Sequence, residues 1–266
     1  MNQSYLKDQV IVVTGASKGI GLATAQLLAR RGARVALLAR DQARLEQAVA
    51  EIGGERGLAL VVDVSNKAAL TEAFDKVAAR WGRIDGVINN VGFQFARRIE
   101  VMPEDESRKI VELNLFTALF GCQVAIPHLR KAGGGRIVNL SSATVRHDNE
   151  FSHLGLYSSC KAAIEHLSKE LRHELKADKI MVSVFSPGAV ATGSIANFDP
   201  AAAGEAMQDW LTKGPKWDGI TQPEVIAEAI AACFELPPGV AVEMMEVRPN
   251  MPMPKMLESE MQKQQG

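Results

Sequence analysis

Seven short apolar runs, each separated from the next by a segment of helical spacing, constrain this chain more than any other feature. The runs are almost continuously apolar, which is typical of strands buried on both faces of a sheet. They lie at Val10–Val13, Val35–Leu38, Ala59–Val62, Gly86–Ile88, Arg136–Leu140, Met181–Phe185 and Val242–Val247. The helical segments are Ile20–Arg30, Arg44–Ile52, Ala68–Ala79, Ile110–Leu129, Ala162–Leu175 and Val225–Phe234. This alternation predicts an α/β fold of the Rossmann-type doubly wound kind, with about seven parallel strands and helices on both faces.

No repeat or linker interrupts the alternation, so we expect residues 1–266 to form a single domain. The alternation of strand and helix patterns is interrupted only between Pro187 and Pro223, where no strand pattern is present. A connection of this length is usually a lid or binding loop with short helices of its own. We therefore predict a substrate lid within residues 189–221, although core packing or a subunit contact would explain its apolar side chains equally well. Those side chains include Phe198, Trp210 and Trp217.

The first apolar run leads directly into a glycine-rich loop, Thr14–Gly21, and the first helical segment follows it. Glycines permit a tight turn and let a phosphate group approach the backbone, while the helix N-terminus presents unpaired N–H groups and a favourable dipole. The loop therefore predicts a pyrophosphate site for a dinucleotide. A tight turn that binds no ligand is the alternative.

The glycine spacing, in which three residues separate Gly15 from Gly19 and one separates Gly19 from Gly21, resembles the TGxxxGxG motif of the short-chain dehydrogenase/reductase family. Further matching stretches are Asp63-Val64, Asn89-Asn90-Val91-Gly92, Asn114, Tyr157-Ser158-Ser159-Cys160-Lys161 and Pro187-Gly188. The family's usual NNAG is NNVG here, a small increase in bulk that we expect the turn to absorb. The resemblance covers nearly the whole chain. It implies an enzyme that transfers a hydride between a nicotinamide cofactor and a carbonyl or alcohol substrate.

The resemblance also implies which residues hold the cofactor. Asp63 and Val64 would flank the adenine, Asn90 and Gly92 would approach the adenosine ribose, and Thr192 would bond the nicotinamide carboxamide. Asp63 could equally be a cap or turn residue before the next helix, and both roles are compatible. The full predicted set is Gly15, Ser17, Lys18, Gly19, Ile20, Gly21, Arg40, Asp63, Val64, Asn90, Gly92, Tyr157, Lys161, Pro187, Gly188, Val190 and Thr192.

The end of the second apolar run indicates which nicotinamide cofactor is used. Strands that prefer NAD usually end in an acidic residue, which bonds the ribose 2′-hydroxyl and repels a 2′-phosphate. Here Ala39 occupies that place, Arg40 follows it, and Lys18 lies in the glycine loop. Because cations form strong, specific contacts with phosphate, the sequence predicts NADP(H). The alternative is that Arg40 only pairs with Asp41 or Glu46 on the surface.

Tyr157 stands four residues before Lys161, so both side chains lie on one face of a helix that begins near Leu156. A phenol has a reference pKa near 10 and exchanges protons poorly at neutral pH. A nearby ammonium lowers the pKa of a phenol, so we expect Tyr157 to act as the acid in reduction and as the base in oxidation.

Family resemblance gives Lys161 a second task, holding the nicotinamide ribose, and gives Asn114 a water that links Lys161 to solvent. It assigns Ser142 to the substrate oxygen, where it would stabilise developing charge, with Ser141 as the competing choice. Ser142 is favoured because the second serine of the pair normally carries this role. Asn114, Ser142, Tyr157 and Lys161 are the predicted catalytic residues, and no metal is implied.

Two further regions border the expected active site. We interpret the spacing between Ser142 and Tyr157 as an insertion within residues 143–156, whose charged part, Arg146–His153, would form either a solvated loop or a substrate contact. Across the predicted cleft, Phe93, Gln94 and Phe95 are expected to line the wall opposite the lid.

The composition limits the partners. A net charge of −1 lacks the basic character needed for nucleic-acid binding, and no stretch approaches the length of an uncharged membrane span. Three scattered cysteines and a polar N-terminus favour the reducing cytoplasm. The resemblance implies a homotetramer or homodimer acting on a small molecule. C-terminal methionines could pack on a neighbouring subunit or fill gaps: Met244, Met245, Met251, Met253 and Met256.

Two rival functions compete with an NADP(H)-dependent carbonyl reductase or alcohol dehydrogenase. One is a cofactor-binding redox sensor or scaffold without turnover, which the presence of Ser142, Tyr157 and Lys161 disfavours because a sensor needs no proton donor. The other is an epimerase or dehydratase of the extended branch, which the glycine spacing and the short chain disfavour.

Overall fold

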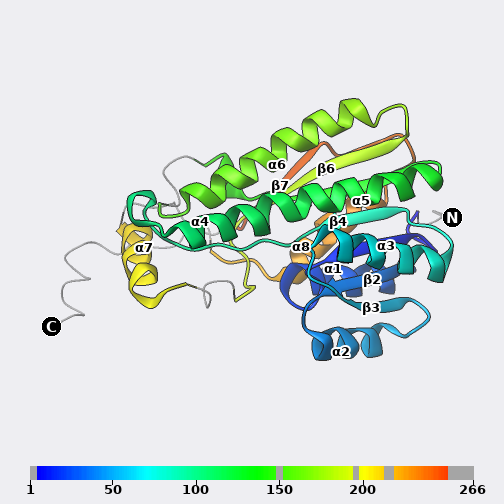
Figure 1. The fold of residues 1–266 in the computed structure, drawn as a ribbon, viewed down its shortest axis with the longest axis horizontal. Helices are drawn as coiled ribbons and strands as arrows, with labels where there is room; N and C mark the ends of the chain where they lie inside the picture. The colour runs from blue at the N-terminus through cyan, green and yellow to red at the C-terminus, as the bar shows by residue number, and fades with distance from the viewer. Residues whose placement is uncertain (1–4, 148–151, 194–197, 213–218, 251–266) are drawn as a thin grey trace.

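One parallel sheet organises the chain in the computed structural model, which describes residues 5–147, 152–193, 198–212 and 219–250. Within these residues, seven strands follow the order β3-β2-β1-β4-β5-β6-β7 (Figure 1). The strands are β1 (Val10–Thr14), β2 (Arg34–Ala39), β3 (Gly57–Val61), β4 (Gly86–Asn89), β5 (Gly135–Leu140), β6 (Ile180–Pro187) and β7 (Met244–Val247). Each predicted apolar run overlaps one of them, so the predicted parallel sheet is confirmed.

Helices cover both faces of the sheet, as the sequence predicted. The helices α1 (Gly19–Arg30), α2 (Gln42–Ile52) and α8 (Pro223–Phe234) share one hydrophobic core with the strands. The opposite face is covered by α3 (Lys67–Trp81), α5 (Thr117–Lys131) and α6 (Gly155–Glu174). The arrangement is therefore the three-layered, doubly wound fold in which a sheet is buried on both sides.

The strand β1 shows why the apolar runs are continuous. Ile11 and Val13 point into the core beneath α1 and α8, whereas Val10 and Val12 point into the core beneath α3 and α5. All four side chains are fully buried. Since burying an aliphatic side chain contributes about 1.5–3 kcal/mol, a polar residue on either face of this strand would be costly.

The fourth helical segment is longer than the periodicity predicted. The helix begins at α4 (Glu104–Val111), passes through a π-helical stretch, η2 (Glu112–Phe116), and continues as α5. Its first turns carry the charged sequence EDESRK, which hides the periodicity. A π-helical turn inside an α-helix often marks a functional residue, and this one contains Asn114.

The helix Glu104–Lys131 also bears on the membrane question. The helix has 28 residues, and an 18-residue window within it is apolar enough, by length and composition only, to span a bilayer, contrary to the sequence-based expectation. Nearly half of its most apolar window, 44%, is buried inside the protein. The buried side chains of α5, including Cys122, Ala125 and Leu129, pack into the core on the sheet, and core helices of this kind pass the same test.

The connection between β6 and α8 contains the helix α7 (Pro200–Thr212), which lies at one end of the molecule beyond the sheet (Figure 1). Phe198 and Trp210 are buried there in a small cluster with Leu154. Several predicted side chains lie outside the described residues, namely Trp217, Met251, Met253, Met256 and the insertion residues 148–151.

Candidate active site

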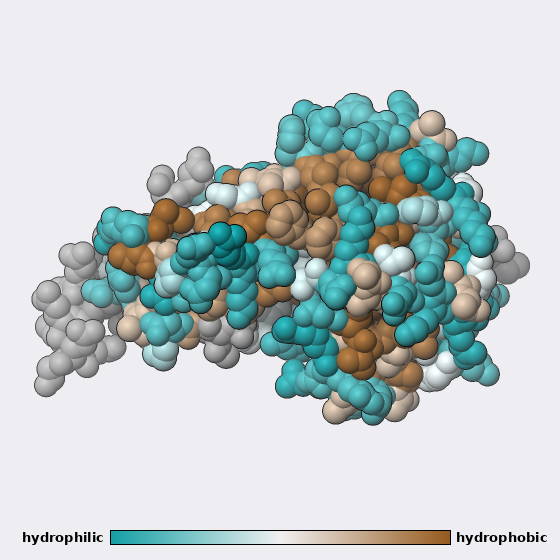
Figure 2. Space-filling model, viewed as in Figure 1, coloured by the Kyte–Doolittle hydropathy of each residue, from teal (hydrophilic) through white to brown (hydrophobic). Residues whose placement is uncertain are grey.

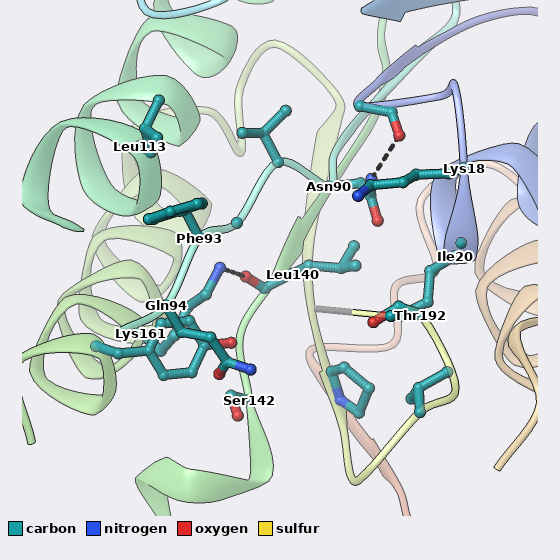
Figure 3. Close-up of a pocket in the computed structure, with 18 of the residues that line it drawn as sticks. Lys18, Ile20, Asn90, Phe93, Gln94, Leu113, Leu140, Ser142, Lys161 and Thr192 are labelled. Atoms are coloured by element: carbon teal, nitrogen blue, oxygen red, sulfur yellow. Dashed lines mark hydrogen bonds between the residues drawn. The ribbon is translucent and has the colours of Figure 1, made fainter. Parts of the chain in front are cut away.

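The carboxyl ends of the strands border a cleft of about 690 Å³. The strand order reverses between β1 and β4, and in doubly wound sheets ligands bind at this switch point. Of the residues predicted to bind cofactor or to act in catalysis, all except Gly21 and Asn114 line the cleft. Figure 3 shows Lys161, Gln94 and Ser142 on one side and Lys18, Ile20 and Thr192 on the other.

The glycine loop joins β1 to α1 in a conformation that requires small residues. Gly19 has a φ of +57°, and a β-carbon there would lie 3.1 Å from Cγ2 of Thr192. A β-carbon on Gly21 would lie 2.5 Å from the carbonyl oxygen of Gly15. Gly21 therefore lies behind the loop and allows α1 to pack against it, which leaves the first turn of α1 facing the cleft.

Asn90, which directly follows β4, holds this loop in place by hydrogen bonds. Its Nδ2 donates to the carbonyl oxygens of Thr14 (2.9 Å) and Gly15 (3.3 Å), and its backbone N–H donates to Thr14 Oγ1 (3.0 Å). The side-chain amide of Asn90 is thus committed to the loop, while the residue still lines the cleft.

Positive side chains gather at the end of the cleft formed by β2 and α2. Lys18, Arg40 and Arg44 all line it and are exposed. The two acidic residues weighed as surface partners of Arg40 are engaged elsewhere. Asp41 accepts a hydrogen bond from the backbone of Arg44 and lies 3.3 Å from its guanidinium, while Glu46 accepts one from Gln42 (2.7 Å).

Asp63 has the turn role that was weighed beside cofactor binding. Its Oδ1 accepts hydrogen bonds from the backbone N–H (3.0 Å) and the hydroxyl (2.8 Å) of Ser65, while Asn66 caps α3. These bonds, the backbone one foremost, hold the pKa of Asp63 below its ordinary value despite partial burial, and the charge of Arg40 adds to the effect. Asp63 also lines the cleft, so the two roles coexist.

Tyr157, Lys161 and Ser142 converge at the other end. Lys161 is buried, its Nζ donates to the carbonyl oxygen of Leu140 (2.9 Å), and it lies 5.7 Å from the ring centroid of Tyr157 (Figure 3). The Ser142 hydroxyl lies near enough to Tyr157 to lower the pKa of the phenol. The spacing of four residues on α6, which begins at Gly155, thus places a phenol and an ammonium side by side.

The protonation states differ from the expectation. Burial raises the pKa of Tyr157 to about 12 and outweighs the lowering effect of the Ser142 hydroxyl. Burial also lowers the pKa of Lys161 to about 8. The pKa of Tyr157 in the protein alone is therefore raised rather than lowered as expected, because burial of the phenol outweighs the influence that lowers its pKa.

The two adjacent serines point to different neighbours. Ser142 borders the cleft, begins the short helix η3 (Ala143–Val145) and accepts a hydrogen bond from the Thr144 hydroxyl (3.0 Å). The hydroxyl of Ser141 donates instead to Glu165 (2.5 Å). The Ser141 hydroxyl is engaged by Glu165, whereas the Ser142 hydroxyl is the one that lowers the pKa of the phenol, which favours Ser142 in the predicted role.

Asn114 lies behind the cleft rather than on its wall. It is fully buried in the π-helical turn, where its Nδ2 donates to the carbonyl oxygens of Phe93 (2.6 Å) and Ile110 (2.8 Å). A β-carbon on Gly92 would lie 3.4 Å from both Asn114 Oδ1 and Lys161 Nζ. The fold therefore places Asn114 and Lys161 on either side of Gly92, which has no side chain to separate them further.

The segment predicted as a lid borders the cleft at its two ends, through residues 189–193 and Ile220, and between them through Trp210. Its indole N–H donates to the carbonyl oxygen of Ser152 (2.8 Å), and the neighbouring Asp209 lies 3.0 Å from His153 Nε2. Phe198 packs edge-on against Trp210 in the small cluster and does not border the cleft. Core packing therefore explains Phe198, whereas Trp210 both packs and lines the site.

Some cleft residues were not foreseen from the sequence. Arg44 was considered only as the start of a helix, although its place four residues after Arg40 puts both on the same corner. Leu113 and Leu154 add apolar wall beside Phe93 and Gln94. Phe95 was expected on the same wall but packs edge-on against Phe93, with ring centroids 4.7 Å apart. No feature of the sequence distinguishes Leu113 or Leu154 from an ordinary core residue.

Comparisons with known proteins agree with this geometry. Residues 9–202 match the family described as short chain dehydrogenase. An uncharacterised oxidoreductase of Staphylococcus saprophyticus is 30% identical over 247 residues, which cover 92% of this chain and 98% of that protein. One from Staphylococcus aureus is 29% identical over 246 residues, 92% of this chain and 99% of the other.

Two solved structures share the fold. The alcohol dehydrogenase from the archaeon Thermococcus sibiricus, complexed with 5-hydroxy-NADP, is 30% identical, with a TM-score of 0.78, and the match covers 94% of this chain and 100% of that one. The 3-ketoacyl-(acyl-carrier-protein) reductase from Brucella melitensis, complexed with NADH, is 26% identical, also with a TM-score of 0.78, over 91% and 98% of the two chains.

Proposed function

The chain belongs to the short-chain dehydrogenase family of oxidoreductases, and from this premise we propose that it is an NADP(H)-dependent carbonyl reductase or alcohol dehydrogenase in which Tyr157 transfers the proton. The observation that carries the proposal is a single cleft with a phenol, a serine and a buried lysine at one end and three cations at the other. The related structures with bound nicotinamide cofactors support it.

The cleft has the features that an extended dinucleotide requires. The glycine loop offers backbone N–H groups at the N-terminus of α1, where a pyrophosphate is stabilised. The β-carbon-free surfaces of Gly19 and Gly92 leave room beside Thr192 and Lys161. Lys161 would hold the ribose near the nicotinamide, and Thr192 the carboxamide. A bound nicotinamide supplies or accepts the hydride.

The cations at the β2 end support NADP(H) over NAD(H). Ala39 ends β2 with no carboxylate, and the adjoining Arg40 borders the cleft together with Lys18. A 2′-phosphate at this corner would meet charge-assisted donors, whereas an acidic residue at position 39 would repel it.

The proton step follows from the protonation states. Since the pKa of Tyr157 is raised to about 12, the phenol is protonated at neutral pH and can donate to a carbonyl oxygen during reduction. The Ser142 hydroxyl would hydrogen-bond the same oxygen and stabilise its developing charge. The ammonium of Lys161, close to the ring, would favour the phenolate that remains.

The remaining proposals concern the cellular compartment, the domain organisation, the oligomeric state and the substrate. We place the enzyme in the cytoplasm as one domain with α7 in its lid. We expect a homodimer or homotetramer, because Figure 2 shows hydrophobic side chains gathered over α5. The exposed Phe116, at the end of η2, stacks on Phe120 of α5. The substrate would be a small carbonyl compound or alcohol.

The test is the absorbance of NADPH during incubation with a panel of aldehydes and ketones, repeated with NADH. Turnover with NADPH preferred, retained by Tyr5→Phe and lost by Tyr157→Phe, is the expected result, and these two are the only tyrosines of the chain. Tight NADPH binding without turnover of any substrate would favour the redox-sensor alternative. A preference for NADH would refute the interpretation of Arg40 and Lys18.

A further inference from the structure

The helix α6, which carries the proposed proton donor, also presents a carboxylate on the same face. Tyr157, Lys161 and Glu165 follow one another at four-residue intervals on α6. The first two border the cleft, whereas Glu165 lies one turn farther from it. Its side chain is only 17% exposed, and the proposed reaction gives it no role.

Both oxygens of Glu165 are used to hold the chain segment around Ser142. Ser141 Oγ donates to Oε1 of Glu165 (2.5 Å), and Arg146 Nη1 donates to Oε2 (2.5 Å). Ser141 immediately precedes Ser142, and Arg146 immediately follows the helix η3 that Ser142 begins. One carboxylate therefore fastens both sides of the Ser142 turn to the helix of Tyr157.

The same arginine ties the turn to the sheet. The Nε and Nη2 atoms of Arg146 lie 3.0 and 2.9 Å from Glu246 Oε2, on β7. His147 Nε2 lies 2.5 Å from the other oxygen of Glu246. Arg146 is thus bridged between two partly buried carboxylates, and the first part of the predicted insertion is anchored rather than solvated.

We propose that Glu165 is a positioning residue that sets the distance between the Ser142 hydroxyl and the Tyr157 phenol. This inference rests on the proposed function, because Glu165 would act only through Ser142. Misplacing a reacting group by about 1 Å can reduce a rate by about 100-fold, so a carboxylate that fixes both sides of a short turn can affect the chemical step without touching the substrate.

The primary test compares Glu165→Leu with wild type. We expect kcat to fall about tenfold or more, while the Kd for NADPH and the KM of the carbonyl substrate change less than about twofold, because the cleft wall is retained. Glu165→Gln keeps an oxygen for Ser141 and should recover part of the lost kcat. Glu170→Leu, on an exposed part of the same helix, is the matched control and should behave as wild type.

A double-mutant cycle separates positioning from general destabilisation. If Glu165 acts through Ser142, Glu165→Leu should cost little further activity when Ser142 is already alanine. A loss in the Ser142→Ala background as large as that in wild type would overturn the proposal. So would a wild-type kcat in Glu165→Leu.

Hydrogen exchange gives a readout that needs no substrate. The amides of Val145, Arg146 and His147 donate within the Ser142 turn, and they should exchange faster in Glu165→Leu than in Glu170→Leu. Unchanged exchange at these three amides would overturn the positioning role whatever the activity. The proposed function fails separately, when wild type binds NADPH and reduces no substrate of the panel.

Discussion

The two ends of the cleft are built on opposite principles. At the catalytic end, Lys161, Ser142 and Asn114 are buried, and each is held by hydrogen bonds to neighbouring elements. At the β2 end, Arg40 and Lys18 are exposed, and their side chains reach into solvent. Burial fixes geometry but penalises charge, whereas exposure leaves charge intact but geometry loose.

This difference suggests a division of labour between chemistry and selection. At the buried end, changes at Ser142 or Asn114, which are not assigned to the cofactor, should alter the rate of the chemical step or the stability of the fold, with little effect on cofactor affinity. Changes at the exposed end should alter the affinity for NADPH, in a salt-dependent way, with little effect on kcat.

The largest effect is expected from Ser142→Ala, which tests the buried end. Loss of the hydroxyl removes a donor aimed at the developing oxyanion, so kcat should fall by about 100- to 1000-fold with the Kd for NADPH unchanged. Ser141→Ala should cost no more than about tenfold, because Ser141 contacts Glu165 and acts only on position. Steady-state kinetics and a fluorescence titration of NADPH measure both quantities. An equal loss in the two variants would contradict the assignment of Ser142.

A stability effect should follow from the buried charge of Lys161. Its pKa is about 8 in the folded protein and 10.5 in the reference state, so between these values the unfolded chain binds more protons and stability rises with pH. Lys161→Met should therefore be more stable than wild type near pH 7. Removing the buried charge contributes up to about 3 kcal/mol, and losing the hydrogen bond to Leu140 offsets about 1 kcal/mol of that gain.

The gap between wild type and Lys161→Met should shrink as the pH rises from about 8 toward 10.5. Urea unfolding of both proteins near pH 7 and near pH 9.5 measures it. Lys169→Met, on an exposed part of α6, controls for the loss of a lysine. A gap that stays constant with pH would show that Lys161 is not penalised by burial.

The difference between the two ends also decides what could be predicted from the sequence. Continuous apolar runs located the seven strands of the described residues because the sheet is buried on both faces, and the four-residue spacing of Tyr157 and Lys161 located them on one helix face. Both rules are local. The start of the helix at Glu104 was missed because its first turns are charged and lack a periodic apolar face.

What could not be predicted depends on contacts between distant segments. The raised pKa of Tyr157 comes from burial that only the assembled fold supplies. The contacts of Glu165 with Ser141 and Arg146 join residues about 20 positions apart, and no spacing rule marks them. The sequence does not distinguish Arg44 from other surface arginines, because only its place beside Arg40 in the folded cleft sets it apart from them.

At the exposed end, Arg40→Ala should weaken NADPH binding by about 10- to 100-fold, the value of a charge-assisted hydrogen bond to phosphate. The Kd for NADH should stay the same, because NADH carries no 2′-phosphate. Arg80→Ala, at an exposed position on α3, is the matched control. Cofactor titrations at low and high salt measure the effect. Equal weakening of both cofactors would place Arg40 away from the 2′-phosphate.

The smallest effect is expected from Arg44→Ala, about two- to fivefold on the Kd for NADPH. Arg44 is 57% exposed and already lies 3.3 Å from Asp41, so only part of its charge is free for a phosphate. Asp41→Asn removes that competition while an asparagine can still cap α2, and it should leave NADPH binding equal or stronger. An Arg44→Ala effect as large as that of Arg40→Ala would show that the two arginines share the phosphate equally. Weaker binding in Asp41→Asn would show that Asp41 does not compete with the phosphate for Arg44.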